Sequence, residues 1–445
     1  MPAIHPFRAV RYAASRPASL GRLIAPPYDA ISPAYRDELV ARSPHNVVHV
    51  ILGKELPGDG PEENKYVRAA RALQSWRDEG AVRQDPVPAL YPVEQSFTGP
   101  DGRPLARRGL IACVPLHDYR EGVVLPHEAT LSAPKLDRLE LLRHVQANLS
   151  PIFGLYEDDR REAHDALAEA IASAGDPIAQ AGTDDGTHHR LWRVEDPETI
   201  ASLQRLLAPR RVLIADGHHR YESAIAYRDL VDREHPGLPA SAGHRFIMMT
   251  LCSMADPGLV IFPTHRLVHG VQGFRLPVFL EELARYFEVE TLLEDLRRPA
   301  GRAWAVSKLA DHAGKSTTFL MVSAEDKKGR ILTLRDDASF ADVSLPANVT
   351  VRDLDVTALH DVILRHLLGL RSDDQDHLRY EMDAGEVVSR TLSGEYQLGF
   401  LVNPTPMWQV AAVAESGETM PQKSTFFYPK LASGLTIRLI SEPLP

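Results

Sequence analysis

Apolar and polar residues follow patterns along the chain that predict both strands and helices. In the first part, apolar runs predict strands at NVVHVIL (46–52), ALYPVEQSF (89–97) and RRGLIACVPL (107–116). The turn-forming tract GPDGRP (99–104) separates the last two, so we expect a hairpin there. Residues 62–79 carry apolar side chains at helical spacing and predict a helix.

Helices and strands then alternate through the middle of the chain. Apolar residues at helical spacing predict a helix that begins near Pro134, PIFGLY (151–156) predicts a strand, and a helix is expected around 160–173. The alternation continues to about residue 233. Two further strands are expected at RFIMMTLC (245–252) and LVIF (259–262).

After Gly270 the pattern is typical of a smaller α+β lobe. It predicts helices at 276–286, 354–367, 384–392 and 405–415, strands near 303–307, 316–323 and 330–335, and a last strand at LTIRLI (435–440). We therefore predict a mixed α/β to α+β fold. Its main region would be residues 1–270, and its smaller C-terminal lobe residues 271–445, either separate or packed into the same unit.

The string VLIADGHHRY (212–221) joins a predicted buried strand to a predicted helix. Backbone N–H groups at a helix start attract anions, and Gly217 would let a ligand approach the backbone closely. His218, His219 and Arg220 add donors, while Asp216 is a carboxylate able to hold Mg²⁺. The plainer alternative is that Asp216 is an N-cap and the histidines are surface residues. The density of ionisable groups favours a phosphate or nucleotide site.

A second string of the same kind, DGTHHR (185–190), lies between a loop-like tract and the extended segment LWRV. It has no helix start, so we predict a solvated hairpin or loop there. Zinc binding at His218 and His219 is disfavoured, because adjacent helical residues point in different directions and metalloprotease histidines are spaced four apart.

Two further segments carry candidate chemistry. In LPHEAT (125–130), His127 and Glu128 precede a loop with the cations Lys135 and Arg138, so Glu128 is a candidate general base. The alternative is a solvated loop before a helix. MPQKSTFFYPK (420–430) offers Lys423 and Ser424, and forms either an anion pocket or a tight loop.

Other motifs are weaker. AGKSTTFL (313–320) lacks the first glycine of a phosphate-binding loop and leads into a strand, so we exclude it. PTHR (263–266) either places His265 and Arg266 beside a substrate or simply follows a strand. PPYD (26–29) is expected to be a structural turn.

Composition narrows the functional classes. The 445 residues have a formal net charge of −10, with 25% charged residues, which argues against nucleic acid as a partner. Only two cysteines occur, as expected of a cytoplasmic protein. We expect no signal peptide, because MPAIHPFRAVRY has no apolar core, and no membrane span.

Several of these motifs together resemble one protein family. PFRAVRY, APPYDAIS, NVVHVIL, LPHEATL, SPIFGLY, IADGHHRYESA, PTHRLV and MPQKSTFFYPKLASG occur in order between Pro6 and about Ile440. This set resembles domain-of-unknown-function family 1015, a family of bacterial and archaeal proteins. The family resemblance does not by itself imply a reaction.

A more distant resemblance implies a fold and an activity. The DGHHR turn is similar to the signature of the ParB/sulfiredoxin superfamily, which implies a ParB/sulfiredoxin-like core. Free-serine kinases of that superfamily combine a PHE segment with a DGHHR-like segment. The resemblance implies that Glu128 is the catalytic carboxylate and that Asp216, His218, His219 and Arg220 form the phosphate and metal site. The two motifs lie about ninety residues apart here, a wider separation than in those kinases.

We therefore expect a small-molecule kinase that transfers phosphate from ATP, ADP or pyrophosphate, with Mg²⁺, to a small hydroxyl compound such as free serine. Glu128, Asp216 and His218 would be catalytic. Gly217, His218, His219, Arg220, Lys135, Arg138, Lys423 and Ser424 would contact phosphate, and His127, His265 and Arg266 the substrate. Asp216 would also hold the metal. The open alternatives are a phosphatase and a non-enzymatic nucleotide sensor. The sequence does not indicate the oligomeric state.

Overall fold

The computed structural model describes residues 3–13, 17–100, 102–371, 374 and 376–444. These residues form two compact units. The first comprises residues up to Pro126, Thr130–Val260 and Pro429 onward, and the second comprises His127–Ala129 and Ile261–Tyr428. The boundary expected at residue 270 therefore lies after Val260, and the C-terminal tail belongs to the first unit. The mixed α/β class is confirmed, and the ParB/sulfiredoxin-like core stays a prediction.

The first unit is built on a mixed sheet of eight strands. In spatial order these are β5 (Val124–Leu125), β10 (Val212–Asp216), β7 (Ile152–Tyr156), β11 (Phe246–Ser253), β4 (Pro104–Pro115), β3 (Tyr91–Thr98), β9 (His188–Leu191) and β8 (Ala179–Gly182). β3 and β4 form the expected hairpin, with Tyr91 opposite Ile111. β10 runs parallel to β5 and antiparallel to β7.

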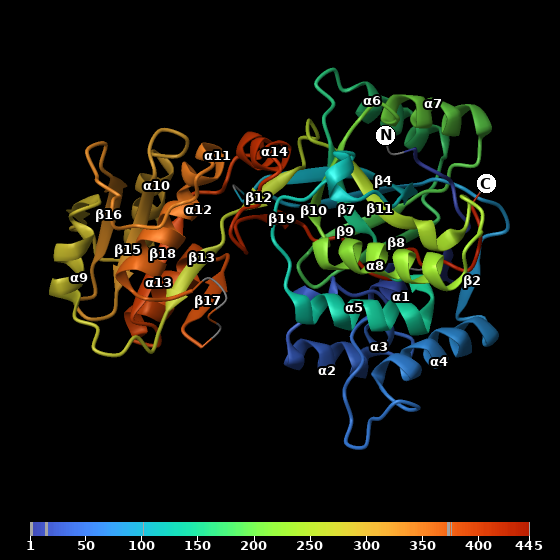
Figure 1. Ribbon diagram of the computed structural model, residues 1–445, viewed down its shortest axis with the longest axis horizontal. Coiled ribbons are helices and arrows are strands. Elements are labelled where there is room, and N and C mark those ends of the chain that lie inside the picture. The colour runs from blue at the N-terminus through green and yellow to red at the C-terminus, as the bar shows by residue number, and fades with distance from the viewer. Residues whose placement is uncertain (1–2, 14–16, 101, 372–373, 375, 445) are drawn as a thin grey trace. The chain divides into compact units, whose positions relative to one another are not determined.

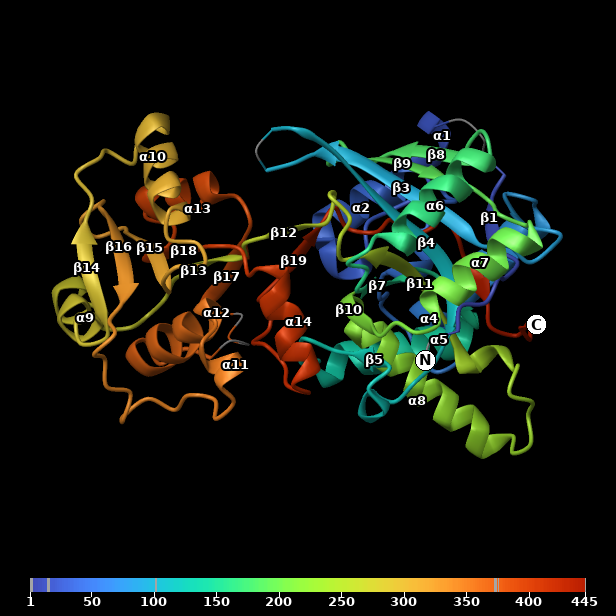
Figure 2. The same cartoon turned by 90° about the horizontal axis from the view of Figure 1, so that it is seen from above.

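Helices cover both faces of this sheet (Figures 1 and 2). They are α1 (Pro17–Gly21), α2 (Pro33–Arg42), α3 (Val48–Ile51), α4 (Lys65–Asp78), α5 (Ser132–Val145), α6 (Glu162–Ser173), α7 (Pro197–Leu207) and α8 (His218–Glu234). Two short pairs, β1 (Val10–Tyr12) with β2 (Val82–Gln84) and β6 (Ala147–Asn148) with β20 (Arg438–Leu439), complete the unit.

Alternation along the strands divides the apolar residues between two cores. In β11, Met248 packs into a core with α3, α4 and α5, while its neighbours Ile247 and Met249 pack into a core with α6, α7 and α8. Successive strand residues point to opposite faces, so one central strand contributes to both cores. For this reason residues 245–252 form a continuous apolar run in the sequence, without the alternating polar residues of a half-exposed strand.

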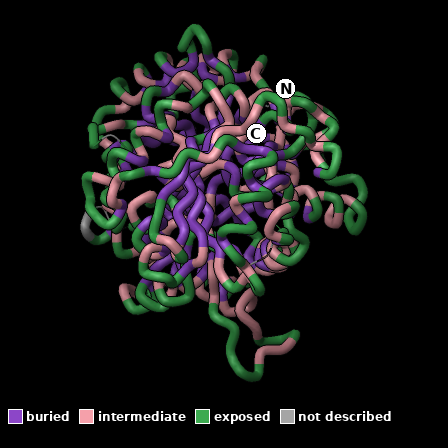
Figure 3. The backbone as a smooth tube through the Cα atoms, turned by 90° about the vertical axis from the view of Figure 1, so that its left-hand side faces the viewer, coloured by how far each residue is buried: buried purple, intermediate pink, exposed green. Residues whose placement is uncertain are grey.

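The second unit is an antiparallel six-stranded sheet. Its order is β14 (Phe287–Thr291), β16 (Gly329–Leu334), β15 (Thr318–Ser323), β18 (Leu398–Val402), β13 (His265–Val268) and β17 (Leu378–Glu381). The helical segments are α9 (Leu276–Leu283), α10 (Pro299–Ala310), α11 (Val349–Arg352), α12 (Asp355–Thr357), the π-helix η4 (Ala358–Leu367), α13 (Ala384–Ser393) and α14 (Met407–Glu415). β12 (Val260–Phe262) pairs with β19 (Phe426–Tyr428). Figure 3 shows buried segments of the chain inside and exposed segments around them.

Several expected elements were wrong. NVVHVIL was predicted as a strand, but its centre is the short helix α3, with Val48, Val50 and Ile51 all buried. Burial on every side removes the helical periodicity from the sequence. Residues 303–307 were predicted as a strand and belong to α10. The last strand is reduced to Arg438–Leu439.

Most of the remaining elements agree with expectation, α4, α5, β7, α6 and α13 among them. The strands β14, β17 and β18 were not foreseen. Asp101, in the predicted turn of the hairpin, lies outside the described residues. None of the described helices combines the length and the hydrophobicity needed to cross a bilayer.

Candidate phosphate-binding site

The DGHHR string lies at a strand-to-helix turn in the first unit, as predicted. All five residues of β10 are buried, and α8 begins at His218 directly after it (Figure 2). Gly217 joins them with φ = 99°. A Cβ at this position would lie 2.9 Å from Arg220 Nη2 and 3.0 Å from Ile152 Cδ1. The turn therefore requires glycine for two reasons, its backbone conformation and the close approach of its neighbours.

The N-cap position of α8 is Gly217, and no side chain caps the helix. Asp216 belongs to the preceding strand, so the alternative that Asp216 is an N-cap is wrong. In the first backbone hydrogen bond of the helix, Tyr221 N–H donates to Gly217 O. The N–H groups of a helix's first turn have no partner inside the helix, and with the helix dipole they favour an anion.

Asp216 is held between two cations. Its side chain is nearly buried, Oδ2 accepts a hydrogen bond from Arg220 Nη2 at 2.8 Å, and Oδ1 accepts one from Lys430 Nζ at 2.5 Å. Burial alone would favour the neutral acid, but Lys430 and Arg220 outweigh it and hold the pKa of Asp216 well below its usual range. The carboxylate of Asp216 is thus paired with both Arg220 and Lys430.

The predicted role of Asp216 as a Mg²⁺ ligand stays a prediction. Each of its oxygens accepts a hydrogen bond from a cation. Over the described part of the chain, no three His, Cys, Asp or Glu side chains come together as a metal site would require. Mg²⁺ prefers several oxygen ligands, so Asp216 alone would not complete its coordination.

Arg220 is oriented more tightly than the sequence suggested. Its Nη1 donates to Pro151 O at 2.6 Å and its Nη2 to Asp216. Within the described residues, its Nε is buried and has no hydrogen-bond partner. The guanidinium is thus fixed against Gly217, where it strengthens the positive potential of the helix start.

Tyr28 of the PPYD turn also belongs to this region, which sequence reasoning missed. Burial, together with the charge of Asp29, raises the pKa of Tyr28 to about 12, and the charges of Arg138 and Arg220 oppose this rise. The Arg138 guanidinium lies 4.1 Å from the centre of the Tyr28 ring. Tyr28, Arg138 and Arg220 line one pocket with about 510 Å³ of empty space, including its open part. A turn motif alone carries no signal of such a contact.

The two cations predicted on α5 have local partners. Lys135 Nζ lies 3.0 Å from Glu222 Oε2 of α8. Arg138 is buried, donates from Nη1 to Ile51 O at 2.7 Å and pairs with Asp137. These contacts fix α5 against α8 and α3. Their predicted contact with phosphate stays a prediction.

The two histidines of the motif differ in surroundings. His218 is buried, while His219 Nε2 accepts a hydrogen bond from Leu131 N–H at 3.0 Å. Thr130, the residue before Leu131, donates from its hydroxyl to Glu222 Oε2 at 2.7 Å. The chain that follows LPHEA is therefore bonded to the first turns of α8.

Glu128 and His127 belong to the second unit, where the 420–425 loop holds them. Glu128 Oε1 accepts a hydrogen bond from Lys423 N–H at 2.6 Å, and Met420 N–H donates to His127 O at 2.8 Å. His127 is fully buried, and its Nε2 lies 2.9 Å from Thr425 Oγ1. The MPQKST segment thus positions the PHE segment, and its role as an anion pocket stays a prediction.

Lys423 acts on Glu128 through its backbone. Lys423 has φ = 58°, a backbone conformation that is uncommon for residues other than glycine, and its N–H points to the Glu128 carboxylate. Ser424 is buried and donates to Pro421 O inside the same loop. The predicted phosphate contacts of both side chains stay predictions.

His265 and Arg266 are buried in β13. His265 Nδ1 accepts from Val402 N–H at 3.1 Å, and burial, with the nearby charge of Arg266, lowers the pKa of His265 to about 4. Arg266 Nη2 lies 2.8 Å from His360 Nε2 and 3.2 Å from Lys423 O. Arg266 therefore supports the loop that binds Glu128. A contact of either residue with substrate stays a prediction.

The DGTHHR string forms the predicted hairpin, in which β8 pairs with β9. The expectation that it is solvated holds for His188, which is exposed, but is wrong for His189, which is 3% exposed. Burial lowers the pKa of His189 to about 4, so the ring is neutral at pH 7. Side chains alternate across a strand, and only one of the two adjacent histidines faces the solvent.

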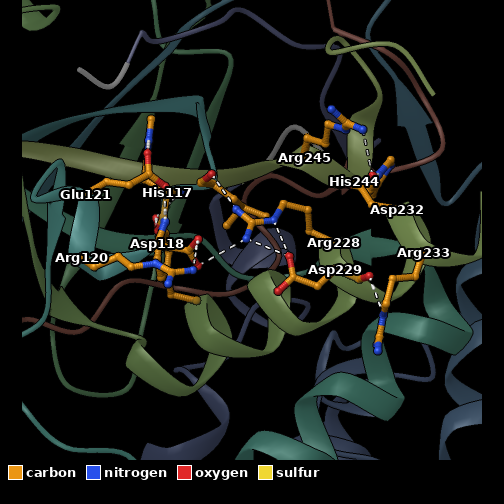
Figure 4. A network of polar contacts seen from close by, with 12 residues as sticks. His117, Asp118, Arg120, Glu121, Arg228, Asp229, Asp232, Arg233, His244 and Arg245 are labelled. Carbon is orange, nitrogen blue, oxygen red and sulfur yellow. Dashed lines mark hydrogen bonds and ion pairs between the residues drawn. The ribbon is translucent and has the colours of Figure 1, made fainter. Parts of the chain in front are cut away.

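Polar contacts also fix the far end of α8 (Figure 4). Arg228 donates to Leu116 O at 3.0 Å and to Asp229, and lies 3.4 Å from Asp118 Oδ1. Asp232 accepts from His244 at 2.7 Å and from Arg245 at 3.0 Å. The helix that begins at the candidate site is thus anchored along its length.

Comparison with solved structures gives low similarity. A free serine kinase in complex with AMP has 12% identity and a TM-score of 0.37, covering 74% of this chain and 92% of that chain. A conserved hypothetical protein from Pyrococcus furiosus has 13% identity and a TM-score of 0.34, covering 74% and 95%. SbnI from Staphylococcus aureus has 11% identity and a TM-score of 0.33, covering 74% and 87%. TM-scores of this size do not establish a common fold.

The sequence comparisons are more decisive. No curated protein matches the chain. Residues 4–357, most of the chain, match the profile of a family described as "Protein of unknown function (DUF1015)". The matched residues include both the LPHEAT and the DGHHR motifs. The chain therefore belongs to the DUF1015 family.

Proposed function

We propose that this protein is a phosphotransferase that binds the transferring phosphate of a nucleotide or another phosphoanhydride at the start of α8. The proposal rests on one observation. The buried carboxylate of Asp216 lies between Arg220 and Lys430, next to a helix start that no side chain caps. Fixed donors and cations around an oxyanion lower the barrier of phosphoryl transfer mainly through electrostatics.

In this proposal Asp216 orients Arg220 and Lys430, which contact the ligand. Without the carboxylate, two neighbouring cations would repel each other, and an entering phosphate would have to organise them. With it, the Arg220 guanidinium is already fixed next to Gly217. Such preorganisation removes part of the entropic cost of binding and of reaching the transition state.

The acceptor in this proposal is a small hydroxyl compound, with free serine as the first candidate, and Glu128 is its general base. The support is the motif resemblance of LPHEAT and DGHHR to free-serine kinases. The hydrogen bond from Lys423 N–H also fixes the position of one carboxylate oxygen of Glu128.

Mass spectrometry of phosphoserine tests the proposal. The protein would be incubated with serine and Mg²⁺, with ATP, ADP or pyrophosphate tested separately. We expect product with one donor, and a loss of at least a hundredfold in Glu128→Gln and in Lys430→Gln. Asp159→Asn, which changes an exposed acid, is the matched control and should retain activity.

The same assay separates the alternatives. Release of inorganic phosphate from phosphoserine without transfer would replace the kinase by a phosphatase. Nucleotide binding without either product would indicate a sensor. Equal phosphoserine formation by the wild type and by Lys430→Gln would contradict the role proposed for the pairing of Asp216 with Lys430.

A further inference from the structure

A buried polar pair lies on the eight-stranded sheet of the first unit, away from the DGHHR turn in the sequence. Gln95 of β3 and Arg107 of β4 are directly opposite each other in the antiparallel pair, and each is only 2% exposed. Side chains of opposed residues lie on the same face of a sheet. Burying an amide and a guanidinium is unfavourable unless both are hydrogen-bonded, so the partners of this pair indicate its role.

The hydrogen bonds of the pair reach two successive carbonyl groups of the C-terminal segment. Gln95 Nε2 donates to Lys430 O at 3.0 Å, and Arg107 Nη2 donates to Gln95 Oε1 and to Pro429 O. A guanidinium is only a donor, so the amide oxygen of Gln95 faces Arg107 and its NH2 group faces Lys430. The backbone is therefore held on both sides of the Cα atom of Lys430.

Arg107 also connects this pair to the strand of Asp216. Its guanidinium lies 4.4 Å from the centre of the Phe153 ring, and Phe153 of β7 is the strand partner of Asp216 in β10. Burial lowers the pKa of Arg107 to about 10, and nearby acids that include Asp216 oppose this shift, so Arg107 is a cation at pH 7.

The residue that the pair holds carries a cation of the candidate phosphate site. Lys430 Nζ donates to Asp216 Oδ1 at 2.5 Å. Lys430 lies outside the helices and strands, so no regular ladder of backbone hydrogen bonds fixes its main chain. A lysine side chain is long and flexible, and the position of its ammonium group depends on a fixed backbone.

We propose that Gln95 and Arg107 are positioning residues, which hold the carbonyl groups of Pro429 and Lys430 so that the ammonium group of Lys430 lies on Asp216 and contacts the transferring phosphate. The role toward phosphate rests on the proposed function. The placement of Lys430 on Asp216 is a separate property, which can be measured without any reaction.

Chemical labelling of Lys430 tests this placement. Acetic anhydride would be applied at limiting concentration, and peptide mass spectrometry would compare the labelling of Lys430 with that of Lys65 in the same unit. We expect Gln95→Met and Arg107→Lys each to raise the labelling rate of Lys430 about fivefold, because the loss of a buried hydrogen bond releases its main chain. Arg107→Lys retains the charge but lacks the planar fork of the guanidinium.

Two further variants calibrate the labelling. Gln180→Met is the matched control, because Gln180 is an exposed glutamine on β8 of the same sheet, and it should leave Lys430 labelling at the wild-type rate. Asp216→Asn removes the carboxylate partner and gives the rate of a released Lys430. Circular dichroism and unchanged labelling of Lys65 check that each variant is folded.

The phosphotransfer assay then separates positioning from a general structural role. Gln95→Met should raise the KM for the phosphate donor and leave the KM for serine unchanged, because Lys430 contacts the phosphate in the proposed function. Equal changes in both KM values would contradict the proposal.

The labelling result also separates this inference from the proposed function. Wild-type labelling of Lys430 in folded Gln95→Met and Arg107→Lys would overturn the positioning role, even if the protein is a kinase. Faster labelling in both variants, in a protein that forms no phosphorylated product, would retain the positioning of Lys430 and reject the kinase.

Discussion

At the scale of single residues, Asp216 is the group whose role the structure changes most. Its position after a strand and before a helix suggested an N-cap or a metal ligand. The structure places Gly217 at the N-cap and pairs the Asp216 carboxylate with Arg220 and Lys430. Lys430 follows Asp216 by more than two hundred residues, and no spacing in the sequence signals that pairing. The contact depends on how the C-terminal segment returns to the first unit.

We predict that Asp216→Asn lowers the free energy of unfolding by about 3 kcal/mol at pH 7, because breaking a buried ion pair leaves cations without a counter-charge. Asp216 has a lowered pKa, so its stabilisation is present above the ordinary carboxyl pKa of about 4 and is lost as the pH falls below it. Urea unfolding measures both effects. Equal stability of Asp216→Asn and the exposed control Asp159→Asn at pH 7 would contradict the pairing.

The glycine before α8 allows a sharper test. Gly217 and Gly186 both have positive φ, 99° and 78°, but only Gly217 has neighbours that a Cβ would meet. We expect Gly186→Ala to cost about 1 kcal/mol from backbone strain alone and Gly217→Ala to cost about 3 kcal/mol. Denaturant unfolding of both variants gives the difference. Similar losses in the two would show that the contact with Arg220 contributes nothing.

At the scale of elements, α8 connects the site to the rest of the first unit. The hydrophobic pattern after Gly217 predicted this helix, and its own polar residues supply part of its anchoring. Asp118 and His244, which complete the network, come from segments that no periodicity relates to α8. The sequence therefore predicted the helix, and tertiary contacts decided how firmly it is held.

We predict that Arg228→Ala lowers the free energy of unfolding by about 2 kcal/mol, because it removes the donor of Leu116 O and the cation that lies beside Asp118 and Asp229. Arg233, on the exposed side of the same helix end, donates only to Asp229 O among the contacts of the described residues. Arg233→Ala should therefore change stability by less than about 0.5 kcal/mol. Thermal unfolding of the pair distinguishes an anchored helix from one held by its apolar face alone.

At the scale of the whole molecule, both units contain buried neutral histidines. Burial lowers the pKa of His189 in the first unit and of His265 in the second to about 4, well below the usual value. These histidines remain neutral in the folded protein at pH values where the unfolded chain already takes up protons. Acid therefore favours unfolding of each unit.

We predict a loss of stability as the pH falls from about 6.5 towards 4, with each such histidine contributing about 1.4 kcal/mol per pH unit. Above pH 6.5 both states are neutral and the effect vanishes. Urea unfolding at several pH values gives the slope of the free energy of unfolding against pH. This slope should correspond to one fewer proton taken up on unfolding in His189→Asn than in the exposed control His188→Asn. An identical slope in both variants would contradict the neutral assignment of His189.

The sequence by itself determined the local features of this protein. Periodicity indicated most helices and strands, including the β3–β4 hairpin and the β10–α8 turn, because these depend on neighbours a few residues apart. The motifs also indicated the family. Short buried segments such as α3 were misassigned, because burial on every side removes the alternation that distinguishes helix from strand.

Only the tertiary structure decided which distant groups meet. It placed Lys430 on Asp216, Tyr28 in the pocket of Arg220, and the 420–425 loop on Glu128. It also made His189 part of a pocket and left His188 in solvent. Electrostatic pairing and burial depend on distances in space between segments far apart in the chain, and a single sequence contains no measure of those distances.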